Sequence, residues 1–183
     1  MPVKRLAYMH AKLVALLVLC NASAVLGQDR LEPTSYTRGL EQDPVRGRII
    51  AVVDGDTVKV LTANQQLIKV ELAFIDCPEL HQTFGNRAKQ AMSILLFGRQ
   101  VELKPHEINR YGSLVAMVYV DGTDAGLQLL KAGMAWPQYR DLSEAPADVQ
   151  YRYLAAGGLA KEQRIGLWID PKPVPPWEWR RVK

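Results

Sequence analysis

The stretch RIIAVVDGDTVKVLT, residues 48–62, indicates the fold class of this chain of 183 residues. Apolar and mostly β-branched residues recur on both sides of Asp54 and Gly55, and this period-two pattern is typical of strands. An Asp-Gly pair between two such runs favours the tight turn of a hairpin. The stretch therefore predicts two antiparallel strands that are joined at Asp54 and Gly55.

The segments after this hairpin extend the pattern. Strand-like alternation occupies residues 66–75, 100–104 and 114–120, with turns at 109–113 and 121–122. Helical spacing occupies residues 84–98, 125–136 and 145–168, although Gly157 and Gly158 weaken the last of these helices. Short strands on a meander, with one helix after the third strand and others at the end, predict a small closed barrel capped by helices. This is an α+β fold that is mainly β.

Composition restricts the class of protein. The chain is 48% hydrophobic and 23% charged, which are the proportions of a soluble globular protein with a sizeable core. These proportions exclude a disordered tail and a protein with several membrane spans. Cys77 is the only cysteine after residue 27, so we expect no intramolecular disulfide and no thiolate metal cluster.

The first 27 residues differ from the rest of the chain. Lys4 and Arg5 precede a short apolar run and small residues, and residues 1–27 contain no acidic side chain. This pattern predicts a signal peptide over residues 1–27 and a secreted or periplasmic protein, and the alternative is a retained membrane anchor. Residues 28–44 predict a flexible lead-in, residues 45–170 the folded domain, and residues 171–183 a Pro/Trp-rich C-terminal tail.

The net charge depends on this first segment. The chain has 23 basic and 19 acidic residues, which gives a net charge of +4. Lys4, Arg5 and Lys12 lie in the predicted signal peptide, so 20 basic and 19 acidic residues remain after it. Overall charge therefore supports nucleic-acid binding only weakly, because such binding would need a local basic patch.

Six separated segments resemble, in order, successive motifs of the thermonuclease family, the staphylococcal-nuclease-like domains. They are VVDGDTVKV (52–60), FIDCPEL (74–80), FGNRAKQA (84–91), NRYGSLVAMVYVDG (109–122), LLKAGMAW (129–136) and IGLWIDPKPVPPWEWRR (165–181). The resemblance extends from residue 48 to about residue 181. It implies an OB-fold five-stranded barrel with capping helices, and a Ca²⁺-dependent nuclease that hydrolyses phosphodiester bonds in DNA and RNA.

The resemblance also implies roles for the acidic residues. Asp56 and Asp76 would bind the metal together with the backbone carbonyl of Cys77, Glu79 would be the general base that activates water, and Asp54 would stand in a second shell behind them. The residue types suit this chemistry, because Ca²⁺ takes about six to eight hard oxygen ligands and water can supply those that carboxylates do not. We therefore expect Ca²⁺ as the cofactor.

Two arginines of the family pattern are replaced. Their positions hold Glu71, in KVELAFID, and Ser113, which closes NRYGS. Phosphoryl transfer builds negative charge on the phosphate oxygens, and loss of one arginine that stabilises this charge costs on the order of 10³ to 10⁵ in rate. Lys69 lies on the same strand face as Glu71 and either reaches the site or pairs with Glu71, whereas Arg110 could turn inward from its loop. We expect neither to restore the bidentate grip of an arginine.

Two classes of function follow from these residues. The first is an exported nuclease with an impaired site, acting on DNA or RNA as a monomer. The second is a non-catalytic module that keeps the barrel and binds a metal, nucleic acid or a protein. Asp54, Asp56, Asp76 and Glu79 favour the first class, whereas the replaced arginines favour the second.

Overall fold

The computed structural model describes residues 44–182. The predicted signal peptide and all but the last residue of the predicted lead-in lie outside the described residues. Within the described part of the chain, no helix combines the length and the apolar character that a membrane crossing needs.

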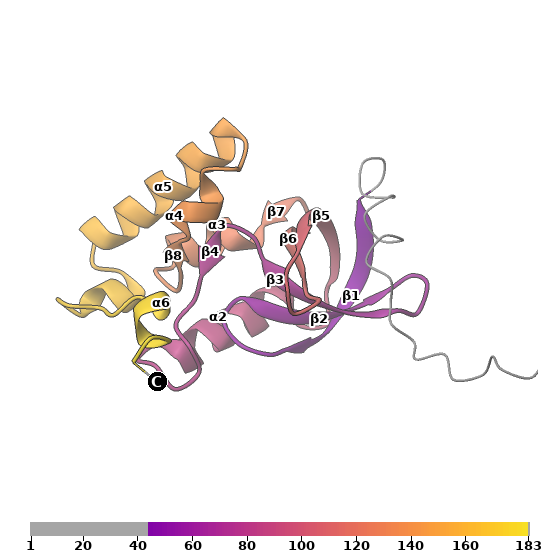
Figure 1. Cartoon of the computed structure of the whole chain (residues 1–183), viewed down its shortest axis with the longest axis horizontal. Helices are drawn as coiled ribbons and strands as arrows, with labels where there is room; N and C mark the ends of the chain where they lie inside the picture. The colour runs from indigo at the N-terminus through magenta and orange to yellow at the C-terminus, as the bar shows by residue number, and fades with distance from the viewer. Residues whose placement is uncertain (1–43, 183) are drawn as a thin grey trace, which may run out of the picture. The chain divides into compact units, whose positions relative to one another are not determined.

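Five strands form a closed barrel (Figure 1). They are β1 (Val45–Val52), β2 (Thr57–Thr62), β3 (Leu67–Leu72), β5 (Gln100–Ile108) and β6 (Leu114–Val120). The order is β3-β2-β1-β5-β6 with antiparallel neighbours, and a parallel pairing of β3 with β6 closes the barrel. Bulges in β1 and β5 bend the strands, as closure requires. This arrangement confirms the predicted OB-fold-like barrel.

Helices and short strands follow the barrel strands, and in Figure 1 most of the helices gather to one side of the barrel. The helices are α2 (Gly85–Leu96), α3 (Ala125–Lys131), α4 (Tyr139–Leu142), α5 (Ala147–Glu162), the 3₁₀ helix η1 (Gly166–Ile169) and α6 (Pro176–Trp179). The short strand β7 (Thr123–Asp124) extends the sheet at β6, while β4 (Ile75–Asp76) pairs with β8 (Trp136–Pro137) in a separate ribbon.

Three predicted elements are shorter than the sequence pattern indicates. The predicted strand over residues 66–75 is interrupted after Leu72, because Phe74 adopts a positive φ of 68°. The predicted helix over 125–136 ends before Gly133, which has a φ of 61° and lies against the backbone of Ile165. The predicted helix over 145–168 ends at Glu162, and Arg164 follows with a φ of 52°.

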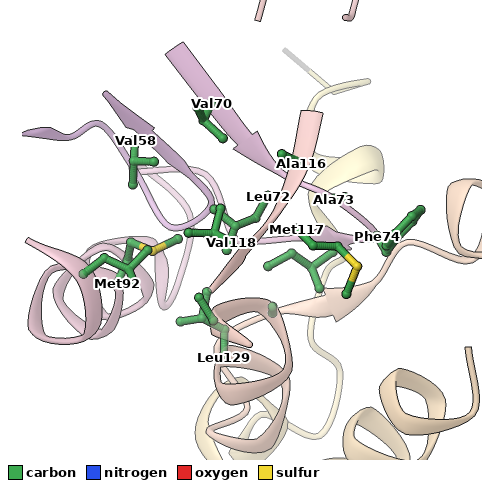
Figure 2. Packing of buried hydrophobic residues seen from close by; sticks show 14 of the residues in the cluster. Val58, Val70, Leu72, Ala73, Phe74, Met92, Ala116, Met117, Val118 and Leu129 are labelled. Carbon is green, nitrogen blue, oxygen red and sulfur yellow. The ribbon is translucent and has the colours of Figure 1, made fainter. Parts of the chain in front are cut away.

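The core fills the barrel and the space beneath the helices. Figure 2 shows Val58 of β2, Met92 of α2, Val118 of β6 and Leu129 of α3 in one cluster, and all four are almost completely buried. Phe74 joins this cluster and stacks against His106 with 4.9 Å between ring centroids. The segment just before Asp76 is therefore held by buried side chains, which fixes the position of the acids that follow it.

Candidate active site

The turn between β1 and β2 is built by the side chain of Asp54. Its Oδ1 atom accepts hydrogen bonds from the backbone N–H groups of Asp56, at 3.2 Å, and Thr57, at 2.8 Å. Such capping by an aspartate is common in turns, because the side chain satisfies backbone donors that the turn leaves open. Asp54 therefore positions Asp56 through the backbone of the turn.

Asp56 connects this turn to the segment after β4. Its Oδ2 atom accepts a hydrogen bond of 2.6 Å from the backbone N–H of Cys77, which is the residue after Asp76. Gly55 permits this approach, since a Cβ atom at Gly55 would lie 2.6 Å from the Cβ of Cys77. Four residues of the predicted site, Asp54, Asp56, Asp76 and Cys77, are thus brought together by one turn and one strand end.

Burial and mutual repulsion act on these acids. Burial raises the pKa of Asp56 well above its usual range, and the charge of Asp54 raises it further, while the N–H of Cys77 acts in the opposite direction. Burial also raises the pKa of Asp76, although hydrogen bonds from a guanidinium oppose that shift. The pKa of the buried Cys77 thiol is raised as well, so its side chain is a neutral thiol and not a nucleophile at neutral pH.

Glu79 lies in the loop between β4 and α2. Its backbone N–H donates to Oε1 of Gln82 at 3.1 Å, and the side-chain amide of Gln82 in turn donates to the carbonyl of Val174. Gly85 begins α2 directly against this loop, because a Cβ atom at Gly85 would lie 1.8 Å from the carbonyl oxygen of Glu79. The loop that carries Glu79 is therefore held both by α2 and by the C-terminal tail.

Arg180 is a site residue that the sequence analysis did not identify. From the end of α6, it donates to Oδ2 of Asp76 at 2.6 Å, to Oδ1 of Asp76 at 3.2 Å and to Oε1 of Glu79 at 2.8 Å. These bonds keep Arg180 protonated, because they raise the pKa of its guanidinium above its already high usual value. The available signal was indirect: several acids predicted to converge need a nearby cation, and the tail contains Arg180 and Arg181.

The two positions of the replaced arginines lie side by side in the barrel. Glu71 on β3 is paired in register with Val115 on β6, two residues after Ser113. Oε2 of Glu71 accepts a hydrogen bond of 2.9 Å from the side chain of Asn109. Ser113 is buried, and its hydroxyl has no hydrogen-bond partner within residues 44–182. Neither position offers a positive charge to a substrate.

The two cations considered as substitutes are engaged elsewhere. Nζ of Lys69 lies 3.5 Å from Oε1 of Glu71, which is the local pair that the sequence analysis gave as one of two alternatives. The guanidinium of Arg110 lies over the ring of Tyr111, 4.8 Å from its centroid. Among the described residues, Arg180 is the cation within salt-bridge distance of Asp76 and Glu79.

The donor set suits a hard cation such as Ca²⁺. Among residues 44–182, no group of three or more His, Cys, Asp or Glu side chains is arranged to hold a metal ion. The predicted set is smaller, with the carboxylates of Asp56 and Asp76 and the carbonyl of Cys77, and water would complete the coordination. These hard oxygen donors are chemically appropriate for Ca²⁺, although both oxygens of Asp76 accept hydrogen bonds from Arg180.

Comparisons with known proteins find related sequences over most of the chain. A family model described as "Staphylococcal nuclease homologue" matches residues 69–170. The chain is 40% identical over 147 residues to a micrococcal nuclease from Shigella flexneri, covering 75% of this chain and 81% of that protein. It is 39% identical over 134 residues to an uncharacterized endonuclease from Haemophilus influenzae, covering 73% and 72%. It is 36% identical over 146 residues to Protein ParB from Escherichia coli, covering 75% and 80%.

Proposed function

Because the chain belongs to the family of staphylococcal nuclease homologues, we propose that it hydrolyses phosphodiester bonds of DNA or RNA at the site formed by Asp56, Asp76 and Glu79. One observation supports this most directly: the 2.6 Å bond between Asp56 and the N–H of Cys77 joins acids from two separate segments in one place. Convergent carboxylates at a strand end form the kind of site that metal-assisted hydrolysis uses.

Each residue of the site has a distinct proposed task. Asp56, Asp76 and the carbonyl of Cys77 would hold Ca²⁺, which when bound supplies positive charge to the phosphate oxygens. Glu79 accepts the proton of the attacking water, since its side chain is partly exposed and so can meet both water and substrate. Asp54 keeps the turn in place through its bonds to the backbone of Asp56 and Thr57.

We propose that this hydrolysis is slow. Glu71 presents an anion beside the site, and the buried Ser113 presents no charge. The pair of Lys69 with Glu71 uses the nearest basic side chain on β3. Because positions 71 and 113 hold no arginine, we expect a rate roughly a thousandfold or more below that of a family member that has both arginines.

The test is a cleavage assay on the purified protein. Single-stranded DNA, double-stranded DNA and RNA are each incubated with Ca²⁺ or with chelator, and we expect slow cleavage that needs Ca²⁺. Glu79→Gln should reduce this cleavage by about 10²-fold or more, the typical contribution of a general base. Glu178→Gln is the matched control, because Glu178 is an exposed acid of α6 that lies outside the site.

Two results would contradict this function. If no substrate is cleaved while Ca²⁺ binds, the chain is instead the non-catalytic module, for which the bond between Arg180 and Glu79 is the favouring observation. If Glu79→Gln cleaves as fast as the unaltered protein, the activity does not come from this site.

We further propose that residues 1–27 are a cleaved signal peptide and that the protein is exported. The basic start, the short apolar run and the small residues after it support this. Mass spectrometry of the exported protein should show a new terminus near Val25 or Gln28. A full-length product in the membrane fraction would contradict it.

A further inference from the structure

The guanidinium of Arg180 fills the place where a cation would bind the acids. Three of its N–H groups point at carboxylate oxygens, and two of these bonds fork onto Asp76. The side chain of Asp76 is only 10% exposed, whereas that of Arg180 is 48% exposed, so the acid is shielded from water and the guanidinium is partly open to it. Charge-assisted forked bonds of this kind are among the strongest hydrogen bonds in proteins.

The tail that supplies Arg180 is held against the site by contacts just before α6 and within it. The side chain of Gln82 donates to the carbonyl of Val174, just before α6 begins. The ring of Trp177 meets the ring of Trp136 edge-on, with 5.7 Å between centroids. Pro176 is buried and begins the helix, where its fixed φ suits the first turn. Arg180 therefore occupies the site as part of a packed segment.

An ion that binds Asp76 must take oxygens that Arg180 now holds. Both Oδ1 and Oδ2 of Asp76 accept from the guanidinium, and the same nitrogen that reaches Oδ1 also reaches Glu79. Coulomb repulsion opposes a divalent ion and a guanidinium at one carboxylate. Because one nitrogen of Arg180 donates to both acids, releasing Asp76 also loosens the contact between Arg180 and Glu79.

We propose that Arg180 is a built-in competitor of the divalent cation, so that Ca²⁺ binding and docking of the α6 segment (residues 174–182) exclude each other at Asp76. This inference rests on the proposed use of Asp76 as a metal ligand. Its consequence is that Ca²⁺ affinity is lowered by the protein's own tail, and that the tail is released when Ca²⁺ binds. A ligand shifts the balance between two states of a protein only as far as its affinities for the two states differ. Here the ligand is Ca²⁺, and the two states are the α6 segment docked and the α6 segment released.

The experiment compares Ca²⁺ binding by calorimetric titration in the full chain and in Arg180→Gln, after removal of bound metal with chelator. We expect Arg180→Gln to bind Ca²⁺ at least about tenfold more tightly, because the ion no longer has to displace the guanidinium. Arg180→Lys should lie between the two, since lysine keeps the charge but loses the fork. Arg181→Gln is the matched control: it removes the same charge from the next residue, whose side chain is exposed.

A second measurement needs no variant. Amide hydrogen exchange of residues 174–182 in the unaltered protein should rise when Ca²⁺ is added, while exchange in β2 and β6 should not. This measurement tests the competition between Arg180 and Ca²⁺ even if Arg180→Gln fails to fold.

Each remaining outcome overturns the inference. Equal affinity in Arg180→Gln and the unaltered protein would mean that ion and guanidinium share the acids, and weaker binding would mean that Arg180 supports the metal site. Absence of Ca²⁺ binding in every variant, or unchanged exchange in residues 174–182, would also exclude competition. Equal Ca²⁺ affinities in Arg180→Gln and the unaltered protein, together with Ca²⁺-dependent cleavage, would overturn this inference and leave the proposed function intact. Tighter Ca²⁺ binding by Arg180→Gln without any cleavage would support this inference and contradict the proposed function.

Discussion

The acidic site and the end of β3 at Glu71 are neighbours that balance negative charge in different ways. Glu71 is paired in register with Thr57, beside Asp56, and its partners are Lys69 on the same strand and Asn109 in the turn between β5 and β6. Asp76 instead meets a cation that lies 104 residues further along the chain. The charge of Glu71 is thus balanced by a lysine on the same strand, whereas the site depends on one distant arginine that, as proposed above, an ion can replace.

The largest effect should come from breaking the backbone support of the site. Gly85→Ala places a Cβ atom 1.8 Å from the carbonyl oxygen of Glu79, so either α2 or the Glu79 loop must move. We expect a loss of about 3 kcal/mol in the free energy of unfolding, at the upper end for overpacking. Urea denaturation measures this loss. The control is Gly158→Ala in α5, where the added Cβ meets no atom within 4 Å. That change should stabilise the helix by about 0.5–1 kcal/mol, and a destabilised control would undermine the interpretation of both.

A smaller effect should come from removing a buried charge from the site. Asp56 has a raised pKa, so the folded protein keeps a proton that the unfolded chain loses above the ordinary value of 3.8. Stability from this group is therefore present at low pH and is lost as the pH rises through the raised pKa. Asp56→Asn cannot ionise, so with chelator present it should be more stable than the unaltered protein at pH 7, by less than the loss expected for Gly85→Ala. The two proteins should be equally stable near pH 3. A loss of stability at pH 7 would show that the charge of Asp56 is fully compensated, like that of Glu71.

The smallest effect on stability should come from changing Glu71 at the end of β3. Glu71→Gln loses the pair with Lys69, but the amide oxygen can still accept from Asn109. Since both charged side chains are partly exposed, we expect a change in unfolding free energy below about 0.5 kcal/mol. Thermal denaturation at low and high salt tests this. A loss of unfolding free energy well above 1 kcal/mol would mean that the end of β3 depends on its ion pair as strongly as the acidic site depends on its own contacts.

The barrel could be predicted because its signals are local. Alternating side chains and Asp-Gly turns lie within a few residues of one another, and they located β1, β2, β5 and β6 from the sequence. The break after Leu72 could not be predicted, because a positive φ at Phe74 has no local signal. It accompanies a tertiary bond of 2.9 Å, from the N–H of Ala73 to the carbonyl of Ala116.

The site could be predicted in part. The acids were found through their motifs, and the structure brings Asp54, Asp56, Asp76 and Cys77 together, although their roles remain predictions. The pair of Lys69 with Glu71 was one of two alternatives, since residues two apart share a strand face. Arg180 could not be located, because a salt bridge between distant residues leaves no periodic pattern in the sequence.

The separation of Arg180 from Asp76 along the chain also bears on the order of folding. The contacts that assemble the acids join residues 3 and 21 positions apart, whereas the contact of Arg180 with Asp76 joins residues 104 positions apart. Chain entropy delays contacts between distant residues, so the barrel and its acids form first and the arginine arrives late. Before that, the nascent barrel exposes an anionic cluster without its counter-charge. The refolding kinetics of this protein should therefore respond to dissolved cations more strongly than the finished fold does.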